Sequence, residues 1–315
     1  MSTPHGRGLV NLDMALRLRD RGPRGLEHFC PCGDPYSGPV RTSRSVIDTP
    51  DFSVHVVSCT ARHHTWSTPE EGGSYGIVLV RRGMFRVRGD GHRMVADPTM
   101  GYAQWPGGEY AFAHPAGGDV CTFVGVRPSL WHAVVGDEPP HPSLAIDGRA
   151  ELAHRLLLRA AHGSADPAER LVHTLVTTIR PRADRRSPNR GGVLADRARE
   201  AILADDPDSA DLVRLARVLG VSPSHLSRTF RRQVGMTVSR YRNRVRVGRA
   251  LARIEEGEQD LAGLAAALGF ADQAHLTRTM RAELGRPPGH IRRLLSPNAC
   301  LVSSPAEQRH QADVI

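Results

Sequence analysis

The sequence contains no lysine, yet the chain is strongly basic. Its 42 basic residues are all arginine and outnumber the 33 acidic residues, so the formal net charge is +9 with the 16 histidines counted as neutral. Arginine presents a planar fork of hydrogen-bond donors that suits phosphates and guanine edges. The replacement of lysine by arginine throughout the chain does not by itself identify a partner.

Long apolar runs and a regular set of cysteines are also absent. No stretch approaches the roughly 18 uninterrupted apolar residues of a membrane span, and residues 1–20 lack the apolar stretch and cleavage site of a secretory signal. An odd number of cysteines, widely scattered, does not form the disulfide framework of a small secreted domain; they are Cys30, Cys32, Cys59, Cys121 and Cys300. We therefore expect a cytoplasmic protein without a membrane partner.

The first half of the chain has the pattern of a β-domain. The 315 residues suffice for about two domains of roughly 100–200 residues each. Residues 1–45 are rich in Gly, Pro and Arg and are predicted to be a disordered lead-in. In residues 46–145, short apolar runs of strand length alternate with turn sequences such as Arg82-Gly83. This spacing predicts a small all-β domain, either a sandwich or a barrel.

The second half has apolar residues at helical spacing. Residues 146–181 are predicted to form a helical hairpin with an apolar stripe on each helix, which either packs against the β-domain or forms a homodimer seam. Residues 182–192 are an expected linker, residues 193–296 are helical in period, and residues 297–315 are an expected disordered tail. The predicted fold class is α+β.

An internal repeat lies within the helical C-terminal region. Residues 211–220 recur as residues 260–269 with the shared pattern DLxxLAxxLG, and HLSRTFR at 225–231 recurs as HLTRTMR at 275–281. Two copies are too few for a solenoid, which needs three or more, and indicate a duplicated supersecondary unit.

Each copy, in residues 211–234 and 260–284, predicts a helix, a turn and a second helix. Asp211 and Asp260 stand where an N-cap carboxylate would accept backbone N–H bonds, and the glycines at the end of each pattern suit a helix C-terminus. The second helices begin at Ser222-Pro223 and at Asp272. The pattern is typical of helix-turn-helix units, which insert the second helix into the DNA major groove.

The outward face of the first copy is basic. Nine arginines and no acidic residue lie between Ser222 and Arg253, a pattern that favours DNA over a merely solvated helix face. Residues 238–256 predict one helix of about 28 Å, with Arg242, Arg244, Arg246 and Arg249 facing outward. Such a rod would hold two recognition helices near one DNA turn apart, about 34 Å, so one chain would read two adjacent major grooves.

The repeat and the residues around it match a known family. The C-terminal third of the chain resembles the DNA-binding domain of the AraC/XylS transcriptional regulators. The resemblance is carried by Leu215-Ala216, residues 220–231, Gly235-Met236-Thr237, Tyr241, Arg246, Ala250-Leu251, Ala265, Gly269-Phe270, Asp272-Gln273, Leu276, Arg278, Arg281, Gly285 and Pro287. Ala274, Met280 and Arg286 depart from the usual pattern, and Ala274 removes one phosphate or base contact.

The resemblance implies more about the fold than the repeat alone. Regulators of this family often carry an N-terminal cupin-like β-barrel that binds an effector, followed by helices that dimerise. We therefore expect a cupin-like barrel, the helical hairpin, and an all-α domain in residues 193–296 with two helix-turn-helix units joined by a linker helix. The predicted DNA-contacting residues are Ser222, Ser224, His225, Ser227, Arg228, Arg231, Arg232, Gln273, His275, Thr277, Arg278 and Arg281.

A set of metal-ligand residue types occurs in the β-region. The candidates are Cys59, His64, His114 and Cys121. Adjacent residues of a strand point to opposite faces, so at most one of His63 and His64 joins a shared site. The interpretation we favour is buried thiols and polar loop histidines, and no metal or other cofactor is predicted. The Cys30-Pro-Cys32 pair does not match the four-cysteine zinc site of Ada-type repair methyltransferases.

These observations predict a sequence-specific transcriptional regulator rather than an enzyme. Its expected partners are double-stranded DNA, a small-molecule effector of unknown identity, RNA polymerase if it activates transcription, and a second copy of the chain. The alternative is a metal-dependent cupin-like enzyme that carries a DNA-binding appendage. A nucleoid-type binder without a regulatory partner is disfavoured because it leaves the β-domain without a role.

Overall fold

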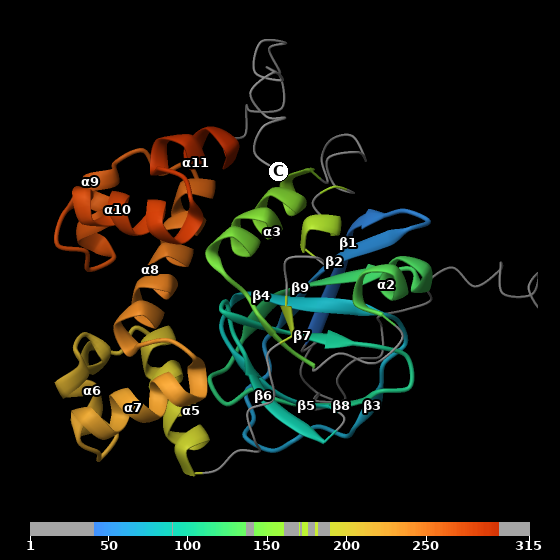
Figure 1. Cartoon of the computed structure of the whole chain (residues 1–315), viewed down its shortest axis with the longest axis horizontal. Coiled ribbons are helices and arrows are strands. Elements are labelled where there is room, and N and C mark those ends of the chain that lie inside the picture. The colour runs from blue at the N-terminus through green and yellow to red at the C-terminus, as the bar shows by residue number, and fades with distance from the viewer. Residues whose placement is uncertain are drawn as a thin grey trace, which may run out of the picture.

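The computed structural model describes residues 41–89, 91–136, 142–160, 170, 172–175, 180–181 and 190–295. Within them an N-terminal part built on β-strands precedes a C-terminal part built on helices (Figure 1). The predicted α+β class is confirmed. The predicted lead-in up to residue 40, most of the linker and the tail, together with Cys30, Cys32 and Cys300, lie outside the described residues.

Two antiparallel sheets make up the β-domain. The larger has the strand order β1-β2-β9-β4-β7-β10-β11 and the smaller the order β3-β8-β5-β6. Among the described strands, pairing stops at these two sheets and does not close a barrel. The strands are β1 (Arg41–Asp48), β2 (Phe52–Cys59), β3 (Glu70–Glu71), β4 (Gly76–Arg82), β5 (Phe85–Gly89), β6 (His92–Ala96), β7 (Met100–Gln104), β8 (Glu109–Ala113), β9 (Asp119–Val126), β10 (Ser143–Ala145) and β11 (Arg180–Pro181).

Both faces of the larger sheet are buried. On β4, Val78 and Val80 point into a core between the two sheets, while Ile77 and Leu79 point into a core on the opposite face. This explains why β4 is apolar at consecutive positions. The tight turn into β5 requires Gly83, which has a φ of +77° and would bring a Cβ to 2.5 Å from the Gly118 carbonyl oxygen.

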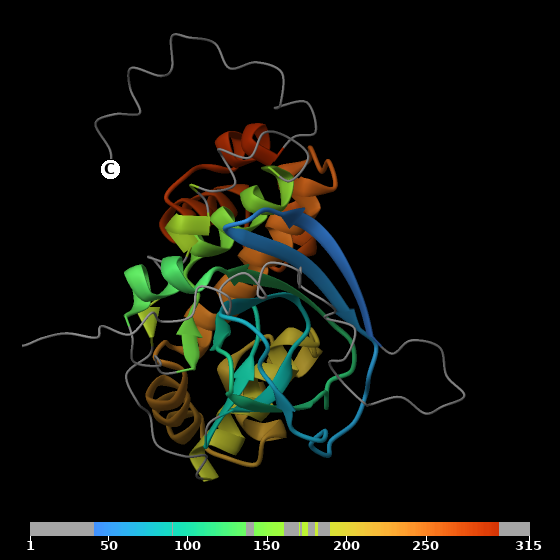
Figure 2. The same ribbon diagram turned by 90° about the vertical axis from the view of Figure 1, so that its right-hand side faces the viewer.

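Helices cover the outer face of the larger sheet. Trp131 of α2 (Pro128–Val135) and Leu157 of α3 (Gly148–Ala160) belong to the outer core, together with Val172 and Leu175 of the next helical segment. Of the apolar residues of the predicted hairpin, Leu152, Leu157, Val172 and Leu175 are buried within the chain, whereas Leu171, Val176 and Ile179 lie outside the described residues. Figure 2 shows the hairpin of β1 and β2 (blue) curving along one side of this domain.

The C-terminal part is all helical. It comprises α5 (Arg190–Leu203), the 3-10 turn η2 (Pro207–Ser209), α6 (Leu212–Val218), α7 (Pro223–Val234), α8 (Val238–Glu255), α9 (Leu261–Ala267), α10 (Gln273–Leu284) and α11 (Pro288–Leu295). One core lies among α5, α6, α7 and the start of α8, and a second among α8, α9, α10 and α11. Among the described helices, none has the length and apolar character needed to cross a membrane.

Three element boundaries differ from the sequence prediction. Strand β1 begins at Arg41, inside the predicted lead-in, because it pairs along its length with β2. Residues 180–181 form β11 against β10 rather than the end of a helix. Helix α5 begins at Arg190, inside the predicted linker. In the two strands, pairing decides the local structure: β1 pairs with the adjacent β2, and β11 pairs with the more distant β10.

Candidate nucleic-acid interface

The first helix-turn-helix unit is formed by α6 and α7. The Asp211 carboxylate accepts the Arg214 backbone N–H at 2.8 Å and begins α6, and the Ser222 hydroxyl accepts the His225 N–H at 3.2 Å and begins α7. Gly220 in the turn has a φ of +71°, and Gly235 ends α7 in the left-handed conformation. The predicted caps are confirmed.

The second unit repeats this construction in α9 and α10. Asp260 caps α9 through the backbone N–H groups of Ala262 and Gly263, each at 3.0 Å, and Asp272 caps α10 through that of His275 at 2.6 Å. The buried faces of the two second helices are equivalent and are filled by Leu226, Phe230 and Val234 of α7 and by Leu276, Met280 and Leu284 of α10. Equivalent faces of α7 and α10 are therefore left outside.

All twelve residues predicted to contact DNA lie on or beside that outer surface. The three half-buried residues are Ser227, His275 and Thr277. The exposed ones are Ser222, Ser224, His225, Arg228, Arg231, Arg232, Gln273, Arg278 and Arg281. The Ser222 hydroxyl already serves as the cap of α7, and a ring nitrogen of His275 accepts the Ala271 N–H at 3.4 Å. Within the described chain, Arg228 and Arg278 form no ion pair, and both are exposed. Arg228 Nε donates to the Ser224 carbonyl at 3.3 Å, which leaves its terminal nitrogens to face a ligand.

The linker helix α8 corrects one detail of the sequence prediction. Arg244 was expected to face outward, but its side chain is buried, pairs with Glu151 of α3 at 3.3 Å and donates to the Ile146 carbonyl. Arg249 is half-buried and pairs with Asp205 at 2.6 Å. These two arginines hold α8 against neighbouring elements. The even spacing of arginines along the sequence does not show which of them make such contacts.

The β-domain contains a cavity between its two sheets. It measures about 570 Å³ with its open mouth included. Most of the wall is apolar and aromatic, and a few polar groups project into it. The lining residues are Arg41, Val57, Cys59, Val78, Phe85, Tyr102, Gln104, Phe112, His114, Asp119, Cys121 and Phe123. A cavity of this composition is typical of small-molecule sites.

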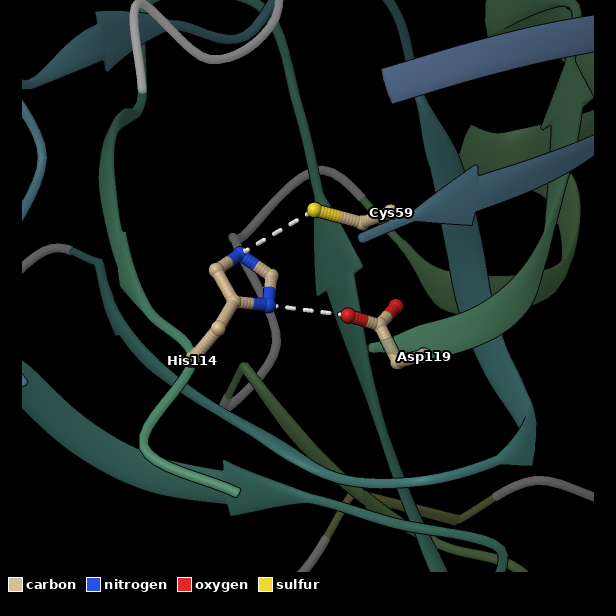
Figure 3. A group of neighbouring side chains, drawn as sticks. All are labelled: Cys59, His114 and Asp119. Atoms are coloured by element: carbon tan, nitrogen blue, oxygen red, sulfur yellow. Dashed lines mark hydrogen bonds and ion pairs between the residues drawn. The ribbon is translucent and has the colours of Figure 1, made fainter. Parts of the chain in front are cut away.

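Three polar side chains of the cavity form a chain of contacts (Figure 3). His114 Nδ1 lies 2.8 Å from Asp119 Oδ1, and its Nε2 lies 3.8 Å from Cys59 Sγ. Burial lowers the pKa of His114, but its hydrogen bonds to Asp119 and Cys59 outweigh this effect and raise that pKa to about 9. The ligand-type atoms of the three residues lie within 4.8 Å of one another.

This cluster differs from the four metal candidates of the sequence. It contains Cys59 and His114, whereas His64 is exposed outside the cavity and Cys121 lines the same cavity without joining the cluster. Asp119 was missed, although it precedes Cys121 by two residues on β9 and therefore shares its face.

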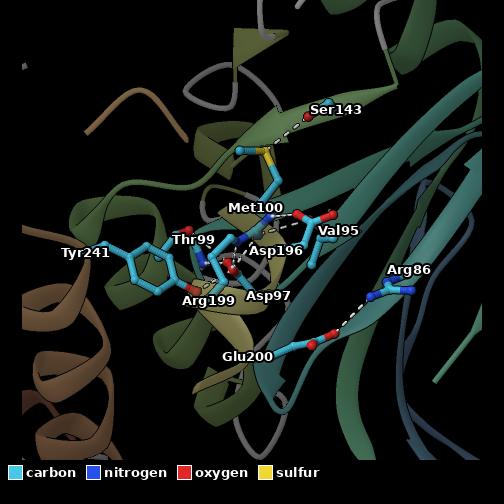
Figure 4. Close-up of polar contacts among 10 residues, drawn as sticks. All are labelled: Arg86, Val95, Asp97, Thr99, Met100, Ser143, Asp196, Arg199, Glu200 and Tyr241. Atoms are coloured by element: carbon cyan, nitrogen blue, oxygen red, sulfur yellow. Dashed lines mark hydrogen bonds and ion pairs between the residues drawn. The ribbon is translucent and has the colours of Figure 1, made fainter. Parts of the chain in front are cut away.

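A second polar cluster joins the β-domain to the helical part (Figure 4). The Asp97 carboxylate, fully buried between β6 and β7, accepts Arg199 Nε of α5 at 2.7 Å and the Tyr241 hydroxyl of α8 at 2.6 Å. Thr99 donates to the same carboxylate through its backbone N–H at 2.7 Å. Sequence reasoning did not identify this contact.

Ion pairs extend that junction along α5 and α8. Arg86 of β5 pairs with Glu200 at 3.1 Å, and Arg81 of β4 pairs with Glu255 at 3.1 Å. Helix α3 adds an apolar contact, because Leu152 belongs to the core of the second helix-turn-helix unit. Both units of the helical part are thus attached to the β-domain.

Comparison with known proteins locates one family in the chain. Residues 215–294 match the model of a family described as a helix-turn-helix domain. No curated protein matches the chain.

Several solved structures are similar at low scores. The crystal structure of ToxT from Vibrio cholerae O395 is 8% identical, covers 79% of this chain and 100% of its own, and has a TM-score of 0.34. The C-terminal domain of AraT, a response regulator from Geobacillus stearothermophilus, is 25% identical over 35% of this chain and 88% of its own, with a TM-score of 0.30. A cupin 2 conserved barrel domain protein from Leptotrichia buccalis is 13% identical over 29% of this chain and 43% of its own, with a TM-score of 0.25.

TM-scores in this range add nothing to the description of the fold, so the assignment depends on the family model and on the helices themselves. The duplicated, capped helix-turn-helix units fall within the matched residues. Residues 215–294 are therefore a helix-turn-helix domain of the AraC type, as the sequence resemblance indicated.

Proposed function

We propose that the protein is a transcriptional regulator that reads two adjacent major grooves of DNA and responds to a small effector in its β-domain. The observation that carries this proposal is the pair of equivalent helix-turn-helix units, each with an exposed polar and basic second helix. The AraC-type domain indicates a regulator rather than an enzyme.

The linker helix supports the reading of two grooves by one chain. Helix α8 has 18 residues, which correspond to about 27 Å of helix axis. Successive major grooves on one face of a duplex are about 34 Å apart. A rigid helix of this length, with a unit packed at each end, holds α7 and α10 at a separation comparable to the spacing of the two grooves.

The connections between cavity and helices support the response to an effector. Two strands carry both a cavity residue and a residue of the junction: Val78 and Arg81 lie on β4, and Phe85 and Arg86 lie on β5. A third strand, β7, carries the cavity residue Tyr102 and directly follows the turn that holds Asp97. A ligand that shifts these strands would alter the contacts that hold α5 and α8. The expected effector is small and largely apolar, with a polar group.

The test is selection of bound fragments from genomic DNA with the purified full-length protein, followed by footprinting at physiological salt. We expect a compact protected site with two motifs about one helical turn apart, and an affinity that falls steeply with salt because bound phosphates release counterions. Protection without a recoverable motif would contradict sequence-specific reading. It would leave only phosphate contacts, which carry no sequence information.

Homodimer formation and contact with RNA polymerase remain proposals within this function. On α3, Leu152 and Leu157 are buried within the chain, so these two side chains do not contribute to a dimer contact. Sedimentation of the protein with and without its selected DNA site measures whether one or two chains bind each site.

A further inference from the structure

We propose that Cys59 is a reactive thiol, activated by His114 and Asp119, and that the cavity captures small α,β-unsaturated carbonyl compounds by covalent addition to it. The inference rests on the proposed function for its regulatory consequence, because the adduct would be the effector signal. The reactivity itself depends only on the cluster in Figure 3.

Asp119 orients His114 toward the thiol of Cys59. His114 Nδ1 is engaged by Asp119 Oδ1 at 2.8 Å, so Nε2 is the nitrogen that faces Cys59 Sγ, at 3.8 Å. A thiol, an imidazole and a carboxylate in this order form the arrangement in which a base activates a nucleophile and a third group orients the base. No side chain of the three has to move to make this arrangement.

Burial strengthens the arrangement. Cys59, His114 and Asp119 are exposed to only 5%, 5% and 4%, so little water competes for their hydrogen bonds, and polar contacts strengthen in a medium of low dielectric constant. The same contact with Asp119 raises the pKa of His114 and makes its imidazole a stronger base. A neighbouring histidine stabilises the thiolate of a reactive cysteine, and the cavity that Cys59 lines lets a small electrophile reach its sulfur.

The cavity provides the selectivity. Val57, Phe85, Phe112 and Phe123 form an apolar wall around the thiol, whereas Arg41 and Gln104 are donors on the same lining. An apolar alkene joined to a carbonyl group suits both parts of this lining. Its carbon chain contacts the apolar wall, and its oxygen can accept a hydrogen bond from a donor.

The chemical step balances without a further reagent. His114 Nε2 takes the thiol proton, and Cys59 Sγ forms a bond to the β-carbon of the unsaturated carbonyl. The π bond between the α- and β-carbons breaks, its electron pair passes toward the carbonyl oxygen, and the proton held by His114 is returned to the α-carbon. The elements of S–H are added across the double bond, nothing leaves, and no oxidant or reductant is required.

Cys121 is an internal comparison. Its thiol lines the same cavity but lies outside the cluster with His114 and Asp119. Burial raises its pKa, which disfavours the thiolate that acts as nucleophile. The proposal therefore predicts two cavity thiols of unequal reactivity.

The experiment treats the purified full-length protein with acrolein and follows the adduct at each cysteine by peptide mass spectrometry. We expect Cys59 to react at least about 10-fold faster than Cys121, a modest share of what a positioned base usually contributes. Asp119→Asn should slow the reaction of Cys59 by about 10-fold, with folding checked by circular dichroism. Asp48→Asn, a matched change of an exposed carboxyl on β1 that does not line the cavity, should leave the rate at Cys59 within about twofold.

Equal rates at Cys59 and Cys121, or a rate at Cys59 that is unchanged in a folded Asp119→Asn protein, would overturn the proposal. So would one equivalent of zinc that stays bound through gel filtration and fully protects Cys59, because the cluster would then be a metal site. These readings need no DNA, so a failure of thiol reactivity is distinguishable from a failure of sequence-specific binding.

The regulatory consequence is tested with the selected DNA site. Acrolein-treated protein should bind that site with at least about fivefold altered affinity, within the usual range of coupling between sites. Treated Cys59→Ser protein should show no such change. An unaltered affinity in protein that is fully modified at Cys59 would overturn the role of the adduct as effector.

Discussion

Arg228 and Arg278 are the residues whose roles in DNA reading can be tested most directly. They occupy equivalent positions on α7 and α10, and both are exposed. An arginine that contacts guanine O6 and N7 with both donors contributes about 1–3 kcal/mol of discrimination. Arg228→Ala and Arg278→Ala should each weaken binding to the selected site by about that amount. Each should also relax the base preference at one of the two motifs only. Titration against a panel of mutated sites measures both effects.

The matched control for these variants is Arg44→Ala. Arg44 is exposed on β1 and lies far from both units along the chain. Its replacement by alanine lowers the net charge by the same one unit as Arg228→Ala or Arg278→Ala. The affinity and site preference of Arg44→Ala should stay as in the wild type. If Arg228→Ala and Arg278→Ala lower affinity equally for every sequence, the two arginines contact phosphates and not bases.

Asp196 on α5 predicts a pH dependence of stability. Burial raises its pKa to about 6, although Arg199 opposes the shift. A carboxyl with a raised pKa stabilises the fold in its protonated form, so this contribution is present below the unfolded value of about 3.9 and is lost as the pH rises through about 6. In urea unfolding from pH 4 to 8, Asp196→Asn should become more stable than the wild type above pH 6. A difference that does not vary with pH would contradict this assignment.

The contacts that sequence reasoning did not find join residues that lie far apart in the chain. Asp97 meets Arg199 and Tyr241 across 102 and 144 residues of chain, and His114 meets Cys59 across 55. No local spacing encodes such contacts, because they depend on how separate elements pack. Arg244 was misassigned for the same reason, since its acidic partner Glu151 lies on α3.

At the level of single elements, α3 is notable because its two faces serve different cores. Leu157 belongs to the outer core of the β-domain, whereas Leu152 and Leu156 pack into the second helix-turn-helix unit. The periodicity of the sequence predicted a single apolar stripe on this helix and did not show that its leucines divide between two cores. Helix α3 therefore ties the β-domain to one DNA-binding unit.

Because Leu152 and Leu157 pack into different cores, replacing each by alanine should loosen a different part of the molecule. Leu152→Ala and Leu157→Ala should each cost about 2–5 kcal/mol, because each removes a buried side chain. Hydrogen exchange should increase mainly in α9–α11 for Leu152→Ala and mainly in the strands of the larger sheet for Leu157→Ala. The same exchange pattern in both variants would show that α3 transmits the loss to both cores.

The helices of the DNA-binding part could be predicted closely, and the sheets only as a class. Each helix has its own signals within a few residues, such as the Asp260 cap and the turn at Gly269, and the structure uses both. The strands also have local signals, but their order in the sheets depends on distant pairing. The placement of β9 between β2 and β4 is an example.

On the scale of the whole molecule, the junction at Asp97 determines how the β-domain is attached to the DNA-binding helices. One buried carboxylate receives donors from both α5 and α8. The turn that carries it leads directly into β7, whose Tyr102 lines the cavity. Any signal that passes from the cavity to the first helix-turn-helix unit has a short covalent path through this turn.

Tyr241→Phe tests this junction while leaving the core in place. The ring packs on Phe230 and stays, so the change removes only the hydroxyl that donates to Asp97. A hydrogen bond to a charged group contributes about 1.5–3 kcal/mol, and the free energy of urea unfolding should fall by that amount. Tyr75→Phe, a half-buried tyrosine of the β-domain, is the matched control and should change little.

A double-mutant cycle with Asp97→Asn decides whether the two residues act together across the junction. Their hydroxyl and carboxylate are in direct contact, so the effects of Tyr241→Phe and Asp97→Asn should fail to add by about 0.5–3 kcal/mol. Hydrogen exchange should also rise in α5 and in the β6–β7 turn of both variants, because Arg199 loses part of its hold there. Fully additive effects would mean that the β-domain and the DNA-binding helices are held by the outer ion pairs instead, and that the Asp97 turn carries no coupling between cavity and DNA.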